Sequence, residues 1–133
     1  MIKWNYKYSV DIPLIDEQHK KLIEIINKAS MVEISSNNPK DVLAILDQMT
    51  EYILKHFETE EHYMKKFHFT GYQSHKNEHI DFTNTTIDYK IRAVGGACQI
   101  VSEILDYLME WLINHIQVTD RKYVDWFKKN GLK

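Results

Sequence analysis

The chain contains long segments in which apolar residues recur every three or four positions, the spacing that places them on one face of an α-helix. The first predicted helix runs from Glu17 to Ile34 and the second from Lys40 to Lys66. The third runs from Tyr72 to Ile91, and the fourth from Ala97 to His115 or slightly beyond. A short last helix is expected from Arg121 to Lys129. The pattern predicts an all-α protein.

The segments before and between these helices are short. Residues 1–14 are rich in aromatic side chains and include Pro13, so we expect an irregular arm that packs across the domain. Asp16 is a candidate N-cap for the first helix. Long helices joined by short loops predict an up-down-up-down antiparallel four-helix bundle with an aromatic N-terminal arm and a short C-terminal helix. We expect one domain over residues 1–133.

Composition excludes several classes of protein. The net charge of −2 gives no reason to expect binding to nucleic acid, and no apolar run approaches the roughly 20 residues that span a bilayer. The start of the chain resembles no secretory signal, and a single cysteine, Cys98, excludes an internal disulfide framework. We read Cys98 as a small packing residue. We therefore expect a cytoplasmic protein, and we also expect a monomer.

The predicted inward stripes contain polar residues where apolar ones are expected. The second helix carries His56 and Glu60 on its stripe, after Ile53, and the third carries His75 and His79. Residues four apart advance about 400° and 6 Å, so each pair shares one helix face. Burying such groups without partners is unfavourable.

Histidines also occupy the stripes of the two remaining helices. They are His19 on the first and His115 on the fourth, where the stripe includes Leu105 and Leu108. One buried histidine is more often a hydrogen-bonded core residue than a metal ligand. Five of them with a carboxylate, all facing the interior of one small bundle, indicate a metal site.

Asp120 is a further candidate, five residues after His115. On an ideal α-helix that spacing leaves the two about 140° apart, so they can meet only if the helix ends, tightens or bulges between them. Asp120 is an equally good candidate for the N-cap of the terminal helix. Glu61, His62 and His68 are expected to be exposed, because they lie off the metal face or near a helix end.

Donor chemistry alone leaves the metal open. Imidazoles and carboxylates without a thiolate are compatible with iron, manganese, zinc or copper. Structural zinc favours closed four-coordinate sites, often with cysteine, so a larger set of donors suits a bridged pair of ions better.

Four motifs together resemble those of the hemerythrin family, and the resemblance covers essentially the whole chain. The arm and the first motif are most similar to the single-domain prokaryotic members. The motifs are Asp16-Glu17-Gln18-His19, His56-Phe57-x-x-Glu60-Glu61, His75-x-x-x-His79 and Trp111-Leu112-x-x-His115-Ile116-x-x-x-Asp120.

This resemblance implies reversible O2 binding at two non-haem iron ions joined by a bridging oxo or hydroxo group. His75, His79 and His115 would hold one iron, and His19 and His56 the other. Glu60 and Asp120 would bridge both. The first iron then has six ligands and the second five, so O2 would bind at the iron held by His19 and His56. The family pattern surrounds that position with apolar side chains, here Leu22, Phe57, Trp111, Leu112 and Ile116.

Other functions use the same irons. A di-iron redox enzyme, such as a peroxidase or a reductase of nitric oxide or O2, is one alternative, although di-iron oxygenases usually have more carboxylates than two. A sensor of O2 or redox state is another. Delivery of O2, its storage and an iron reserve are all compatible with the sequence, which identifies no protein partner.

Overall fold

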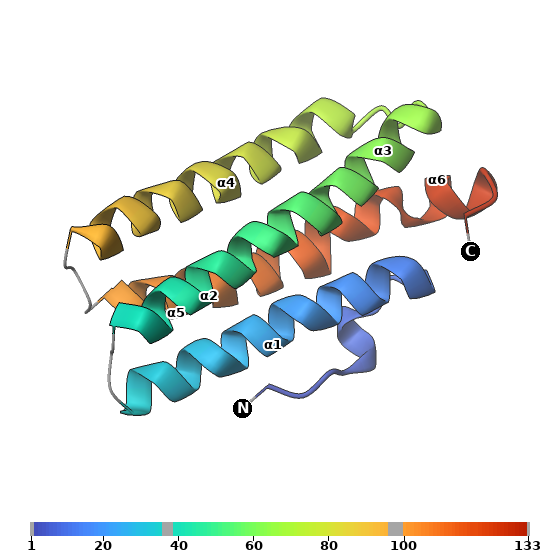
Figure 1. The fold of residues 1–133 in the computed structure, drawn as a ribbon. Helices are drawn as coiled ribbons and strands as arrows, with labels where there is room; N and C mark the ends of the chain where they lie inside the picture. Colours follow the sequence, from blue (N-terminus) through green and yellow to red (C-terminus); the bar gives the residue numbers. More distant parts are fainter. Residues whose placement is uncertain (1, 36–38, 96–99, 133) are drawn as a thin grey trace.

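The computed structural model describes residues 2–35, 39–95 and 100–132, and these residues form a four-helix bundle. Its four long rods run alternately in opposite directions (Figure 1). The first rod is α1 (Pro13–Ser35), and the third is α4 (Tyr72–Val94). The second rod consists of α2 (Pro39–Tyr52), the π-helical segment η2 (Ile53–Phe57) and α3 (Glu58–Lys66). The up-down bundle predicted from the sequence is confirmed.

The fourth rod changes its helical form along its length. It consists of α5 (Val101–Trp111), the π-helical η4 (Leu112–Thr119), the 3-10 turn η5 (Asp120–Tyr123) and α6 (Val124–Lys129). The predicted terminal helix is therefore continuous with the fourth helix. Cys98 and the predicted start of this rod at Ala97 lie outside the described residues.

The first helix starts earlier than predicted, at Pro13 rather than Glu17. Proline suits a first helical turn because its missing N–H needs no partner there. Asp16 therefore lies inside the helix, and its prediction as the N-cap was wrong. Its carboxylate instead accepts hydrogen bonds from the Val10 N–H at 2.8 Å and the Ser9 hydroxyl at 2.5 Å. These bonds attach the N-terminal arm, which contains the 3-10 turn η1 (Tyr6–Tyr8), to the bundle.

Two residues of the predicted stripes, Ile53 and Leu105, pack against the apolar core but are partly rather than fully buried. Tyr52, the neighbour of Ile53, is buried, since it lies three residues after Met49 and four before His56 on the same helix face. Ile104, the neighbour of Leu105, is fully buried, since Val101, Ile104 and Leu108 follow the helical spacing and α5 packs on α1.

The apolar interior has two parts. The larger cluster lies among the four rods, and the smaller one lies near the N-terminal arm and α6. Leu22, Phe57 and Ile116 belong to the larger cluster. The smaller cluster contains Val10, Ile12, Ile15, Met64, Tyr123 and Phe127.

The turn between α3 and α4 is close-packed. A Cβ atom on Gly71 would lie 2.7 Å from Cε2 of Phe69, so a larger residue would displace that ring. The indole N–H of Trp126 donates to the Phe67 carbonyl at 2.6 Å and thereby connects α6 to this turn. This end of the bundle is therefore held by contacts from both halves of the chain.

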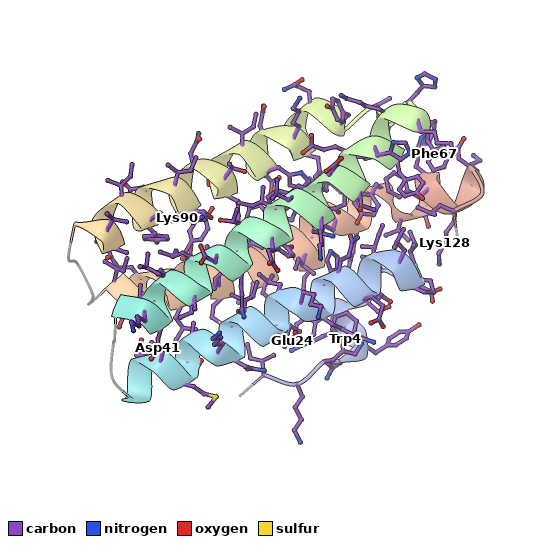
Figure 2. All side chains as sticks on the ribbon, viewed as in Figure 1. Trp4, Glu24, Asp41, Phe67, Lys90 and Lys128 are labelled. Atoms are coloured by element: carbon purple, nitrogen blue, oxygen red, sulfur yellow. The ribbon has the colours of Figure 1, made fainter. Side chains whose placement is uncertain are left out.

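The outer surface is polar where the helices face solvent. Charged side chains such as Glu24 and Lys128 lie on the outside, while Trp4 of the arm lies beside α1 (Figure 2). Within the described part of the chain, no helix combines the length and the hydropathy needed to cross a lipid bilayer.

Candidate metal centre

The polar residues of the stripes form one layer between the two apolar clusters. On α1, for example, His19 lies between Ile15 of the smaller cluster and Leu22 of the larger one. Every member of the layer is at most 2 % exposed. The structure thus brings together all seven candidates: His19, His56, Glu60, His75, His79, His115 and Asp120.

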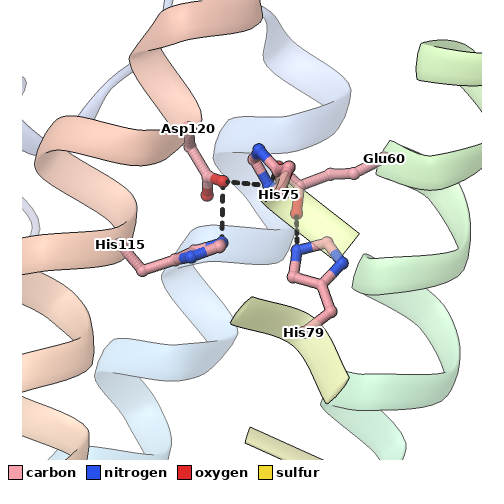
Figure 3. Close-up of side chains that lie close together, drawn as sticks. All are labelled: Glu60, His75, His79, His115 and Asp120. Atoms are coloured by element: carbon pink, nitrogen blue, oxygen red, sulfur yellow. Dashed lines mark ion pairs between the residues drawn. The ribbon is translucent and has the colours of Figure 1, made fainter. Parts of the chain in front are cut away.

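These residues form two groups that share both carboxylates. Ligand atoms of Glu60, His75, His79, His115 and Asp120 lie within 4.8 Å of one another, as do those of His19, His56, Glu60 and Asp120. Figure 3 shows the larger group, with three imidazoles and two carboxylates converging from three of the four rods. One group therefore contains three histidines, and the other contains two.

The shortest distances join imidazole Nε2 atoms to carboxylate oxygens. Asp120 Oδ1 lies 2.8 Å from Nε2 of His75 and 2.9 Å from Nε2 of His115, while Asp120 Oδ2 lies 2.8 Å from Nε2 of His19. Glu60 Oε1 lies 2.9 Å from Nε2 of His56. The Nε2 atoms of His19 and His56 are 3.0 Å apart, so two potential ligand atoms face each other.

Most of these atoms are close without being aligned as hydrogen-bond partners. Within the described residues, both oxygens of Glu60 and of Asp120 are buried without a hydrogen-bond partner, as are Nε2 of His75, His79 and His115. Unpaired buried polar atoms are rare in folded proteins because their desolvation is not compensated. Their convergence from several sides fits metal ions as the missing partners, and the donor set is nitrogen and oxygen only.

The π-helical segments explain how the helices supply these side chains. In a π turn each N–H bonds to the carbonyl five residues earlier, so residues five apart share a face. His115 lies within η4, and Asp120 is the first residue after η4. The π-helical turn therefore brings Nε2 of His115 to 2.9 Å from Oδ1 of Asp120. The sequence required the helix to end, tighten or bulge between His115 and Asp120, and the structure shows a bulge. η2 likewise contains His56.

The charges within the cluster determine its proton affinities in the metal-free chain. Burial alone would lower the pKa of His56 and His75, but the carboxylates of Glu60 and Asp120 outweigh it and raise the values to about 9 and about 10. Burial would raise the pKa of Asp120, but His115 and the other histidines hold it well below its usual range. The carboxylates are therefore anions across the physiological range.

Three polar residues outside the cluster orient its histidines. Nδ1 of His56 lies 2.8 Å from Oε1 of Gln18, and Nδ1 of His79 lies 2.9 Å from Oε2 of Glu61. Nδ1 of His115 lies 2.9 Å from Oε1 of Glu78. A proton on Nδ1 leaves Nε2 free as a metal ligand, which is the usual arrangement around protein-bound metals.

The prediction that Glu61 is only a surface charge was therefore wrong, and Gln18 and Glu78 were missed. Each of the three is the sequence neighbour of a cluster residue, so it points about 100° away, toward the next helix. That adjacency was the signal available in the sequence. His62 and His68 are exposed, as predicted.

All five residues of the predicted O2 pocket are buried in the larger apolar cluster: Leu22, Phe57, Trp111, Leu112 and Ile116. Two of them stack on histidines of the three-histidine group. The Phe57 ring lies 3.8 Å from the His79 ring at 3°, and the Trp111 ring lies 3.9 Å from the His115 ring at 12°. These rings shield the imidazoles from solvent and restrict their rotation.

Two buried tyrosines beside the cluster were also missed. Tyr52 stacks on His56 with ring centroids 5.0 Å apart, and Tyr123 lies 5.5 Å from the His75 ring. Burial raises the pKa of both tyrosines well above the usual value, and the charges of Glu60 and Asp120 raise it further. Both phenols are therefore neutral at physiological pH.

Comparison with known proteins relates the whole site to one family. The model of the hemerythrin HHE cation-binding domain matches residues 10–127. Bacteriohemerythrin of Stenotrophomonas maltophilia is 29% identical over 128 residues, which cover 96% of this chain and 82% of that protein. Bacteriohemerythrin of Clostridium acetobutylicum is 29% identical, with 94% of this chain and 100% of that protein covered.

Solved structures support the same relationship at the level of the fold. A crystal structure of wild-type hemerythrin superposes with a TM-score of 0.81 at 23% sequence identity, covering 96% of this chain and 98% of that one. A hemerythrin mutant superposes with a TM-score of 0.86, again at 23% identity. The family match extends over nearly the full chain and includes every residue of the buried cluster. The chain belongs to the hemerythrin family.

Proposed function

We propose that this protein binds O2 reversibly at a pair of iron ions and acts as an O2 carrier or store. The observation that carries the proposal is the pair of ligand groups that share Glu60 and Asp120. Its relatives named bacteriohemerythrin support the same reading. Iron ions bound there, with a bridging oxo or hydroxo group, would supply the electrons that O2 binding requires.

The unequal number of histidines suggests where the small ligand binds. His75, His79 and His115 would hold one ion, and His19 and His56 the other, with Glu60 and Asp120 bridging both. The two-histidine ion then has one protein ligand fewer. We infer that its remaining position receives O2.

The surrounding residues suit reversible binding. Leu22 and Ile116 are fully buried, and Phe57 and Leu112 are at most 3 % exposed. None of these side chains carries a proton that it could transfer. An apolar wall of this kind keeps water and external reductants from a bound ligand, which favours release of O2 over its further reduction.

The domain organisation, the oligomeric state and the location of the protein also belong to this proposal. We expect residues 1–133 to act as one domain and the protein to act as a monomer in the cytoplasm. A di-iron redox enzyme or a sensor would use the same residues, and the experiment below separates these functions.

The decisive experiment is an optical titration with O2. Protein reconstituted with ferrous iron under argon would be exposed to air, returned to argon, and assayed for iron per chain. We expect two irons and a coloured adduct that disappears under argon and returns in air. Two irons that oxidise at once without a recoverable adduct would favour the enzyme or the sensor, and a chain without iron would contradict the proposal. The His62→Ala variant is the matched control, because His62 is exposed.

A further inference from the structure

Tyr52 carries a buried hydroxyl whose purpose the fold does not explain. The residue is 4 % exposed, and its ring packs between His56 and the edge of Phe57 at centroid distances of 5.0 and 5.3 Å. Among the residues that the structure describes, its hydroxyl has no hydrogen-bond partner. A phenylalanine would fill the same space without leaving a donor unpaired, so the hydroxyl requires an explanation.

The ring of Tyr52 lies on the two-histidine side of the cluster, because it stacks on the His56 ring. Burial and the charges of Asp120 and Glu60 raise the pKa of Tyr52, while the indole N–H of Trp111, which points toward the Tyr52 oxygen, lowers it. The indole N–H of Trp111, which is 7 % exposed, also has no partner within the described ranges. The neighbour of the Tyr52 oxygen is thus a second donor, so the hydroxyl hydrogen of Tyr52 has no acceptor among the described residues.

A cavity at the surface of the bundle borders the two residues of this stack. It has a volume of about 530 Å³, lies between α1 and α2, and is lined by both Tyr52 and His56. Charged residues of its rim include Lys21, Glu51 and Lys55. Tyr52 and His56 therefore both lie at the wall of this cavity, on the two-histidine side of the centre.

We propose that the Tyr52 hydroxyl donates a hydrogen bond to the small ligand that binds on the His56 side of the centre. This inference rests on the proposed function, because it requires a metal ion with an exchangeable position. The ligand class is a diatomic or triatomic acceptor such as O2 or azide. Tyr52 then selects for ligands that accept a hydrogen bond, and the space around it is not purely apolar.

The test compares Tyr52→Phe with wild type and with Tyr89→Phe as a control. Tyr89 is another tyrosine of low exposure, but its hydroxyl lies 3.4 Å from the Glu103 carbonyl, remote from the cluster in the sequence and outside both ligand groups. Azide would be titrated into the iron-loaded, oxidised proteins. We expect the Kd for azide to rise roughly tenfold in Tyr52→Phe, the usual effect of losing one hydrogen bond to an anion, and to stay unchanged in Tyr89→Phe.

A second measurement separates ligand binding from a purely structural role. In the iron-loaded protein without azide, Tyr52→Phe should melt at the wild-type temperature or above, because the hydroxyl it lacks has no partner there. The infrared stretch of bound azide should shift between H2O and D2O in wild type and lose that shift in Tyr52→Phe.

Three results would overturn the inference. Equal azide affinities of Tyr52→Phe and wild type would show that the Tyr52 hydroxyl does not contact the ligand, and would leave the proposed function intact. Loss of several degrees in the azide-free melt, or failure of Tyr52→Phe to fold, would show that the hydroxyl stabilises the protein itself. An iron-loaded wild-type protein that binds no azide would overturn both this inference and the proposed function.

Discussion

Glu78 accepts a hydrogen bond from Nδ1 of His115 at 2.9 Å, although the two residues lie on neighbouring rods of the bundle. His79, the next residue after Glu78, points into the cluster itself. The same relationship joins Glu61 to His79 and Gln18 to His56. Three of the four rods therefore present one side chain to the centre and its sequence neighbour to the outer nitrogen of an imidazole on another rod. The positions of His56, His79 and His115 therefore each depend on two helices at once.

Replacing Glu78 by alanine should weaken metal binding without unfolding the chain. His115 would lose the acceptor that fixes its orientation, and loss of such a partner typically lowers metal affinity about 10–100-fold. Competition with a chelator of known affinity measures the change. Glu110→Ala is the matched control, because Glu110 lines the same groove as Glu78 and is exposed. Equal metal affinity of the Glu78 variant and wild type would contradict the positioning role.

Removing single histidines should lower the iron content unequally. His56→Ala leaves His19 as the only histidine of the smaller group, so we expect iron per chain to fall to roughly half. His79→Ala leaves two histidines in the larger group, and we expect weaker retention during dialysis. Elemental analysis of purified variants measures both, with His62→Ala and His68→Ala as exposed controls. Unchanged iron in either cluster variant would contradict the ligand assignment.

Metal removal should destabilise the bundle. The emptied cluster keeps buried carboxylates and imidazoles, several of which lack a hydrogen-bond partner among the described residues. A metal present at about 1,000 times its Kd stabilises a protein by about 4 kcal/mol, so we expect the Tm to fall by roughly 10–15 °C. Calorimetry with and without a chelator measures this difference. A metal-free form that melts no lower than the loaded form would be inconsistent with the proposed centre.

The metal-free protein should lose stability as the pH rises above neutrality. Its folded-state pKa values for His56 and His75 are about 9 and about 10, both above the ordinary value of 6.5. A raised folded-state pKa gives stability that is fully present below about pH 6.5 and disappears as the pH passes the folded-state value. The free energy of unfolding should therefore decrease between pH 7 and 10, by at most about 1.4 kcal/mol per pH unit for each histidine.

Urea unfolding of chelator-treated protein across that range measures the effect. The carboxylates affect stability at low pH instead, because the lowered pKa of Glu60 and Asp120 gives stability that is lost only in acid. The loaded protein is the control, since metal ions replace the protons. A free energy of unfolding that is constant or rises between pH 7 and 10 would show that the two histidines do not hold these protons.

The sequence by itself determined the four rods and every member of the cluster except Asp120. Both depend on local periodicity, because residues four apart share a helix face whatever the neighbouring helices do. His19, His56, Glu60, His75 and His79 could be recognised because each interrupts an apolar stripe. The family motifs added the division into two ligand groups, which the geometry matches.

The tertiary structure decided what local periodicity cannot describe. The π-helical turn of η4 changed the register, which brought Asp120 beside His115. A pattern of 3.6 residues per turn contains no information about such a turn. Glu61 and Glu78 were assigned only once the rods were packed, because a side chain off the metal face reaches another helix only at a particular rotation and distance between them.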